Sequence, residues 1–411
     1  MPCHGKLDIL SYKLSSYCLA LRPWTFTASV TPVLLGTVLA YKHALFLTPS
    51  ASAPDHFSAT ILALTLLISL ATHGAGNLVN SYYDFLLGVD ALKGPAARDR
   101  TLLDRVLAPP EVVNLAGFLY LAACAALLAL CRVSPARTEH LALLFFGGMS
   151  GSFLYTGGGV GLKYFAGLGD LVAALVFGPV CVSFGYLAHS GRHASLLEVP
   201  LVYSLPLFAA AIAVAHAANS VDAFLSPPRS RQRTVTFNTP LQLRVTTFAH
   251  VIGPILSAYL YAAALLSPYA MFLYLSITRH SFWFLLPSLT LFKSLRSVKR
   301  FSQSLNATSG ADSRDSYFLN EVIRKFGLLF SVFSSVSDSY SLSPTLSNGK
   351  ATAYHSRDSG GDHGYLPSPL RISTFNVENI PYKTAKLNFE MGVYYVLACY
   401  LAPSKHMFQQ M

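Results

Sequence analysis

The chain has 411 residues, of which 53% are hydrophobic and 12% are charged, and its formal net charge is +11. A soluble globular protein carries about twice this share of charged residues, so the composition argues against an ordinary soluble enzyme. The charged residues also avoid long stretches of the chain, which is typical of membrane spans. Because only helices and closed barrels satisfy their backbone within lipid, the sequence predicts an all-α integral membrane protein.

Nine apolar runs have the length of a span, and we expect each to be a transmembrane helix embedded in the lipid bilayer. They are residues 24–41, 58–83, 111–131, 140–157, 168–188, 199–218, 245–266, 268–292 and 388–402. The boundary between the seventh and eighth runs rests on the sequence LLSPYA.

The basic residues lie mostly in the short loops after runs two, four, six and eight. Positive-inside bias explains this distribution, so these loops and the N-terminus are expected in the cytosol and no nucleic acid partner is predicted. We divide the chain into a cytosolic segment (1–20), a membrane domain with eight spans (21–301), a disordered insert (302–380) and the last span (381–404). The insert is assigned from its Ser-, Gly- and Asp-rich composition.

The second apolar run ends in GNLVNSYYDFLLGVD, residues 76–90. Asn80 and Asp84 are four residues apart, so on a helix they share one face. Asp90 could join them if Gly88 unwinds the end of the helix. Carboxylate and amide oxygens are the ligands that Mg²⁺ prefers, and Mg²⁺ commonly bridges carboxylates to phosphate oxygens. The stretch therefore suggests a Mg²⁺–diphosphate site, although polar residues at a span end often only meet water.

Two further features favour an anion near this stretch. The sequence AARDRTLLDRVL follows it and contains Arg100, a side chain suited to phosphate. The run SFLYTGGGVGLKYFAGLGDL (152–171) is rich in glycine and offers the ammonium of Lys163, although it lacks the Walker A pattern. Glycines alone are as easily explained by a turn between two spans.

Three stretches, LALRPWTFTASVTPVLLG (19–36), GNLVNSYYDF..GVD with DRTLLDRVL (76–107) and SFLYTGGGVGLKYFAGLGDL, resemble the UbiA superfamily of membrane prenyltransferases. The resemblance is to its MenA-like branch, and TAKLNFEMGVYYVLACYLAPS (384–404) matches the last span of that branch. The resemblance implies a bundle of nine transmembrane helices around a central cavity that opens sideways to lipid.

The resemblance also implies roles for individual residues. The first acidic motif of the branch falls on Asn80, Asp84 and Asp90, which would bind Mg²⁺ on a prenyl diphosphate. Lys163 matches the lysine that contacts the diphosphate, and Arg100 an arginine of the cap. Asp84, Lys163 and Arg100 are thus the expected catalytic residues, and Arg22, in the motif RPW, is a further expected contact to diphosphate or substrate.

The second acidic motif of the branch reads H-S-N-N-T-R-D-x-x-x-D, and the aligned stretch here is HAANSVDAFLS. Three positions match it: His216, Asn219 and Asp222. Asn219 is expected to help bind the cofactor and diphosphate, and Asp222 to bind the metal. Three positions differ, with Ala218, Val221 and Ser226 in place of asparagine, arginine and aspartate. Three explanations for these differences are open: the enzyme is impaired, arginines of the following insertion replace the lost groups, or the sequence contains a mis-predicted exon boundary. The abrupt break in similarity at the motif favours the mis-predicted exon boundary.

The expected activity is therefore Mg²⁺-dependent transfer of an isoprenyl group, of geranylgeranyl type, from a diphosphate to a naphthoquinol, as in menaquinone-4 synthesis. A ubiquinone- or haem-type prenyltransferase, a non-catalytic isoprenoid- or quinone-binding protein and a transporter are the alternatives. The resemblance favours the endoplasmic reticulum or Golgi as the location, and leaves mitochondrial membranes open.

Overall fold

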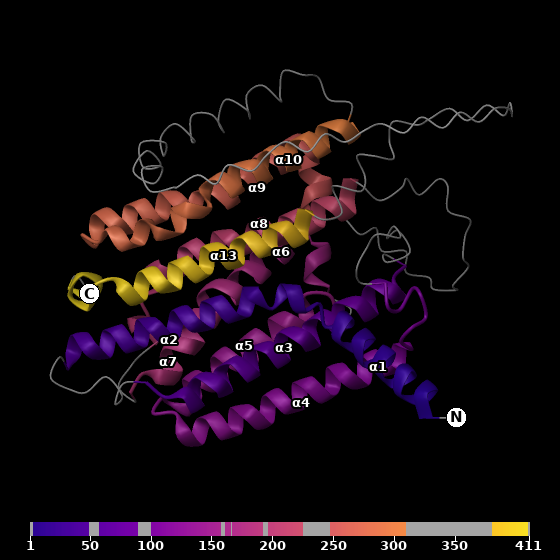
Figure 1. Ribbon diagram of the computed structural model, residues 1–411, viewed down its shortest axis with the longest axis horizontal. Coiled ribbons are helices and arrows are strands. Elements are labelled where there is room, and N and C mark those ends of the chain that lie inside the picture. Colours follow the sequence, from indigo (N-terminus) through magenta and orange to yellow (C-terminus); the bar gives the residue numbers. More distant parts are fainter. Residues whose placement is uncertain are drawn as a thin grey trace, which may run out of the picture.

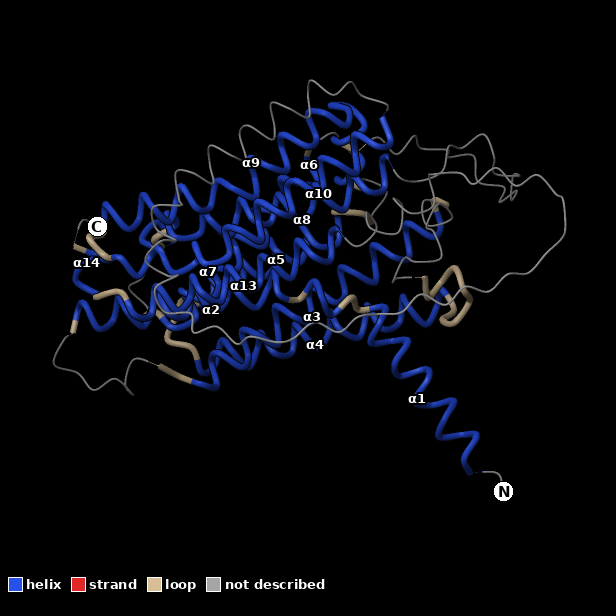
Figure 2. The backbone as a smooth tube through the Cα atoms, turned by 45° about the horizontal axis from the view of Figure 1, so that its top comes forward, coloured by secondary structure: helices blue, strands red, loops and turns tan. Residues whose placement is uncertain are grey.

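The structure is a computed structural model of the whole chain, and its described part is almost entirely helical (Figure 1). The described residues are 3–48, 57–88, 100–157, 161–165, 167–191, 196–224, 247–309 and 380–409. The expected insert at 302–380 lies largely outside them. Long helices lie side by side with roughly parallel axes in both views (Figures 1 and 2). The all-α class is therefore confirmed.

Among the described residues, six helices are long and apolar enough to cross a membrane. They are α2 (Thr27–Leu47), α3 (Ala59–Leu86), α4 (Pro109–Val133), the segment Leu168–His189, α8 (Leu205–Phe224, with a span at Leu201–Val221) and α9 (Phe248–Thr278). The segment Leu168–His189 consists of α6 (Leu168–Leu175), a π-helical stretch (Val176–Val180) and α7 (Cys181–His189).

Two other expected spans are helical without meeting these conditions. α5 (Thr138–Leu154) has 17 residues, fewer than the ~20 that cross the hydrocarbon core. α13 (Ile380–Leu401) begins with a polar half that contains Lys383, Lys386 and Glu390. The count of nine spans and the central cavity therefore remain predictions.

The expected boundary between the seventh and eighth spans, at LLSPYA, is wrong. α9 continues through Pro268 to Thr278, and its non-helical residue is instead Gly253, at φ 77°. Proline is tolerated within a membrane helix when neighbouring groups compensate for the lost backbone bond. The next residue, Tyr269, is buried, and its hydroxyl group lies 2.7 Å from Thr290 Oγ1. A 3₁₀ segment (Phe282–Thr290) then leads into α10 (Leu291–Ser309).

α2 and α7 approach each other closely because each presents a glycine to the other. A Cβ atom at Gly36 would lie 2.1 Å from the carbonyl oxygen of Val182, and one at Gly185 would lie 2.5 Å from that of Val33. Small residues at helix interfaces give membrane bundles their tightest backbone contacts. The pair therefore fixes the spacing of α2 and α7.

Replacing Gly36 with Ala should lower the stability of the bundle by about 1–3 kcal/mol, because the added methyl group forces two backbones apart. Thermal unfolding of the purified protein in detergent or nanodiscs measures this. Gly117→Ala in α4 is the matched control, since a Cβ atom there has no neighbour within 4 Å. Equal melting temperatures for the two variants would contradict the close contact.

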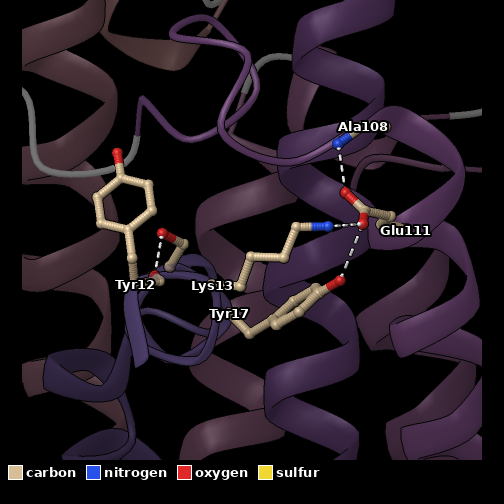
Figure 3. A network of polar contacts seen from close by, with 6 residues as sticks. Tyr12, Lys13, Tyr17, Ala108 and Glu111 are labelled. Carbon is tan, nitrogen blue, oxygen red and sulfur yellow. Dashed lines mark hydrogen bonds and ion pairs between the residues drawn. The ribbon is translucent and has the colours of Figure 1, made fainter. Parts of the chain in front are cut away.

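α1 (Cys3–Ala20) leaves the bundle at an angle, near the end of α3 and the start of α4 (Figure 2). It is tied to α4 by Glu111, whose Oε1 accepts hydrogen bonds from Lys13 Nζ at 2.9 Å and from the Tyr17 hydroxyl at 3.2 Å (Figure 3). The other oxygen of Glu111 accepts from the Ala108 amide at 2.8 Å and thereby caps α4. The bond to Glu111 raises the pKa of Lys13. This contact places α1 at the end of the bundle that holds the residues described next.

Candidate functional site

A stripe of polar side chains runs along one face of α3 toward its C-terminal end. Its members are His73, Asn77, Asn80, Ser81 and Asp84, and each is buried or half-buried. Spacings of three and four residues put them on one side of the helix, which the sequence predicted for Asn80 and Asp84. Polar residues on the inner face of a membrane helix are costly unless they have partners, so their contacts identify the region as a candidate site.

Lys163 is the centre of the contacts at the end of this stripe. Its ammonium donates to Asn80 Oδ1 at 2.8 Å and to Asp84 Oδ1 at 2.5 Å. The Thr156 hydroxyl also donates to Asn80 Oδ1, at 2.6 Å. The side chains of Lys163 and Asp84 are only 10% and 7% exposed. The structure thus brings together Asn80, Asp84 and Lys163, three residues that the sequence singled out. The buried ammonium of Lys163 lies between the two oxygen atoms that accept its hydrogen bonds.

The glycine-rich segment around Lys163 holds it in place. Gly161 has φ 49° and precedes a single 3₁₀ turn (Leu162–Tyr164), and the Lys163 amide donates to the Tyr155 carbonyl at 2.8 Å. A Cβ atom at Gly169 would lie 2.6 Å from Cα of Lys163, so the start of α6 packs directly on the lysine backbone. Leu162–Tyr164 thus form one turn between α5 and α6, whereas the glycine run for which the sequence predicts a tight loop lies largely outside the described residues.

Arg22 also reaches the polar stripe, whereas Arg100 has a partner of its own. The Arg22 Nη2 atom donates to Ser81 Oγ at 2.9 Å, one turn before Asp84. Arg100 donates from Nε and Nη2 to Asp104 Oδ1 at 3.2 and 3.1 Å. The sequence did not suggest Asp104, which lies four residues after Arg100 in a non-helical turn, where the Asp104 amide also donates to the Arg100 carbonyl at 2.8 Å. Asp90, the third residue of the expected metal site, lies outside the described residues.

A second polar cluster joins α6 and α8. Asp170 Oδ1 accepts from Asn219 Nδ2 at 2.5 Å, and Asp170 Oδ2 lies 3.3 Å from His216 Nδ1. His216 Nε2 lies 3.2 Å from the carbonyl oxygen of Ser257 in α9. Asp170, His216 and Asn219 are 6%, 0% and 8% exposed. Asp222 lies on the same helix three residues after Asn219, and its side chain is outside the description.

Asp170 is a site residue that our sequence reasoning missed. The sequence contains a feature that could have identified it: Asp170 is a lone acidic residue at the start of an otherwise apolar run. Acidic residues within membrane spans usually mark functional positions. The preceding residue, Gly169, packs on Lys163. At the start of α6, Gly169 thus contacts the first cluster and the next residue, Asp170, belongs to the second.

The first cluster, around Lys163, contains oxygen atoms that suit Mg²⁺ as ligands. Asn80 and Asp84 aim two oxygen atoms at one cationic group, the ammonium of Lys163, and amide and carboxylate oxygens are the usual protein ligands of Mg²⁺. Within the described ranges, no group of three or more His, Cys, Asp or Glu side chains is placed to hold a metal ion. The described donors therefore fit a metal that takes its remaining ligands from water and phosphate.

Comparison with known proteins assigns the family. The UbiA prenyltransferase family profile matches residues 34–320. The chain is 38% identical over 322 residues to the UbiA prenyltransferase domain-containing protein 1 homolog of Drosophila melanogaster, covering 78% of this chain and 79% of that protein. It is 42% identical over 295 residues to UbiA prenyltransferase domain-containing protein 1 of Homo sapiens, covering 72% and 78%.

A solved structure with a similar arrangement is that of a UbiA homolog from Archaeoglobus fulgidus bound to DMAPP and Mg²⁺. Its TM-score is 0.49 at 15% sequence identity, and the match covers 79% of this chain and 98% of that one. The family profile spans more than half of this chain, and the animal relatives exceed 30% identity over most of their length. This membrane protein therefore belongs to the UbiA prenyltransferase family.

Proposed function

We propose that the protein transfers an isoprenyl group from a prenyl diphosphate to an aromatic quinol, with Mg²⁺ as cofactor. The observation that carries this proposal is the buried meeting of Asn80, Asp84 and Lys163 at the end of α3, with the Arg22 side chain one turn away. This arrangement offers oxygen ligands and cationic groups together, as a metal–diphosphate headgroup needs. The apolar helices around it suit a substrate whose tail stays in lipid.

In the proposed reaction, the bond between the allylic carbon and the diphosphate oxygen breaks, and the ring carbon of the quinol forms the new bond to that allylic carbon. A proton then leaves the ring and restores its aromaticity. Bound Mg²⁺ would supply electrostatic stabilisation of the leaving diphosphate. Asn80, Asp84 and Asp90 would hold it, with Asp222 and Asn219 contributing from α8.

The side chains of this chain have distinct tasks in that reaction. Lys163 and Arg100 would stabilise the charge that builds on the diphosphate as it departs, and Arg22 would orient it. Tyr82 and Tyr83 form an edge-on pair at the end of α3, with ring centroids 5.5 Å apart. Their faces suit shielding of an allylic cation, although packing is the simpler role for tyrosines in a bundle.

The choice of substrates rests on the resemblance of the first acidic motif, by its spacing, to the MenA-like branch. This resemblance favours a naphthoquinol acceptor and a geranylgeranyl-type donor, as in menaquinone-4 synthesis, over a ubiquinone- or haem-type reaction. The same resemblance favours the endoplasmic reticulum or Golgi as the location.

A second candidate function is supported by α8. Two of the replaced positions of the second motif, Ala218 and Val221, are half-buried in this helix, and Val221 packs against the hydrophobic core. An apolar face here would suit a protein that binds isoprenoid or quinone without turning it over. The two candidates differ in whether a prenylated product forms.

Membranes that contain the protein should convert geranylgeranyl diphosphate and menadiol to a prenylated naphthoquinol when Mg²⁺ is present, and oxidation by air during work-up then gives the quinone that is detected. The product should vanish with EDTA, because the charge on the departing diphosphate is then not compensated. It should also vanish in Asp84→Ala, which removes a metal ligand and leaves the Lys163 ammonium without its carboxylate partner. Gly117→Ala serves as the control for expression and insertion. A product that forms without a divalent metal would overturn the proposed mechanism, and binding without any product would favour the second candidate.

A further inference from the structure

Asp170 lies next to Gly169 at the start of α6, and both of its oxygen atoms are in use within the second polar cluster. One oxygen accepts from the amide of Asn219 at 2.5 Å, and the other faces His216 Nδ1 at 3.3 Å. The residue is 6% exposed in a helix that is otherwise apolar. A carboxylate is expensive to bury in such a place unless its contacts compensate, so this position must do more than fill space.

The contact with Asp170 determines which way the amide of Asn219 points. An ionised carboxylate accepts hydrogen bonds and donates none, so it selects the NH₂ side of the amide. The amide is planar, and Oδ1 of Asn219 must therefore point away from Asp170. Oδ1 is the atom of this side chain that can bind a metal ion, or accept a hydrogen bond from its water ligands. Without Asp170, either orientation of the amide is available.

His216 is held by the same carboxylate from one side and by α9 from the other. Its Nδ1 faces Asp170 and its Nε2 lies 3.2 Å from the Ser257 carbonyl, so the ring joins α6, α8 and α9. His216 and Asn219 are three residues apart and share one face of α8. The carboxylate thus fixes the rotation of α8 about its axis and, with it, the direction of the face on which Asn219 lies.

The first cluster is held by Gly169, the residue of α6 that precedes Asp170. Gly169 lies against the backbone of Lys163, where a Cβ atom would come within 2.6 Å of Cα. Lys163 in turn bonds to Asn80 and Asp84 of α3. The sequence Gly169–Asp170 therefore sets the distance between the groups on α3 and those on α8 that would act on one headgroup.

We propose that Asp170 is a positioning residue for diphosphate binding: it orients the Asn219 amide and the face of α8 toward the groups gathered around Lys163. The inference rests on the proposed function, since it assumes that a metal–diphosphate headgroup binds between α3 and α8. It assigns no contact between Asp170 and the substrate itself.

The test measures binding of geranylgeranyl thiolodiphosphate, an analogue that resists ionisation, with Mg²⁺ to the purified full-length protein. Asp170→Asn should weaken binding about 10- to 100-fold, the usual effect of removing a group that orients a metal ligand. Asn219→Ala should weaken it as well, and the double variant should bind no worse than Asn219→Ala alone, because Asp170 acts through Asn219. Glu390→Gln, which removes a carboxylate from an ion pair at the bundle surface, should bind like the unaltered protein.

A swapped pair tests whether the contact between positions 170 and 219 is itself what supports binding. In the double variant Asp170→Asn with Asn219→Asp, the amide at 170 donates to the carboxylate at 219, so the contact returns with its partners exchanged. This variant should recover most of the binding lost in Asp170→Asn, and it remains testable if Asp170→Asn alone does not fold. Failure of the swap to recover binding would overturn the inference.

The remaining outcomes distinguish this inference from the proposed function. If Asp170→Asn lowers only the melting temperature of the ligand-free protein and leaves analogue affinity unchanged, Asp170 is a structural residue and the inference fails. If the unaltered protein binds the analogue but forms no prenylated quinol from the reactive diphosphate, the proposed activity fails while the inference can still hold. If the unaltered protein binds no analogue, both fail.

Discussion

Replacing Lys163 with Met should reduce prenyl transfer by about 10²–10³-fold, the usual effect of removing one group that stabilises charge in a transition state. The substitution keeps the length of the side chain but removes the ammonium that contacts Asn80 and Asp84. The measurement is the rate of product formation in membranes or nanodiscs at saturating Mg²⁺. Lys13→Met is the matched control, because Lys13 pairs with Glu111 at the surface and lies outside both polar clusters.

The affinity of Lys163→Met for the metal alone is a second measurement on this variant. In the structure, the Lys163 ammonium donates hydrogen bonds to the two oxygen atoms that would also bind Mg²⁺, so lysine and metal compete for them. Lys163→Met should therefore bind Mn²⁺, used as a paramagnetic substitute for Mg²⁺, at least as tightly as the unaltered protein in the absence of diphosphate. Full transfer activity in Lys163→Met would remove this lysine from the mechanism, and weaker metal binding would show that no competition exists.

Replacing Val221 with Arg should raise the rate of prenyl transfer about 10- to 100-fold, provided that the altered second motif limits the enzyme. An arginine can hold phosphate oxygens through two parallel hydrogen bonds, and each charge-assisted bond contributes about 1.5–3 kcal/mol. Val221 is half-buried against the core, and the aliphatic stem of arginine can cover the same apolar surface while its charged end reaches water. The increase should be largest at low diphosphate concentration.

Val221→Met is the control for that experiment, because it adds length without charge. If Val221→Arg is no faster than Val221→Met, a missing arginine at this position does not limit the reaction. Faster transfer with arginine would show that the scaffold retains a diphosphate site next to α8 despite its altered motif. Adding Ala218→Asn to Val221→Arg then restores the asparagine of the second acidic motif and tests whether it raises the rate of transfer further.

The membrane class and the shared face of Asn80 and Asp84 follow directly from the sequence. Long runs without charge have few structures available to them in lipid, because every backbone group needs an internal partner. The four-residue spacing of Asn80 and Asp84 places them on one face of any helix that contains both. Lys163 is expected from the sequence to contact the diphosphate, whereas its hydrogen bonds to Asn80 and Asp84 are seen only in the structure.

Other features required the tertiary structure. The helix break at LLSPYA was expected because proline lacks an amide hydrogen, yet α9 continues through Pro268 and leaves helical geometry at Gly253. Local sequence does not show which neighbours compensate for the lost bond. The partner of Arg100 is likewise Asp104, at the surface, in a segment whose path depends on the ends of α3 and α4.

Local sequence is enough to predict that this chain forms apolar helices and that one of them ends in oxygen ligands, with basic side chains in other segments. The joining of Asp170 to His216 and Asn219, which are 46 and 49 positions away along the chain, could not be predicted in this way. The difference lies in the range of the interactions concerned. Helix periodicity and hydrophobic length act between near neighbours, whereas the rotation and depth of each helix depend on contacts such as Gly169 on Lys163, which exist only after the bundle has packed.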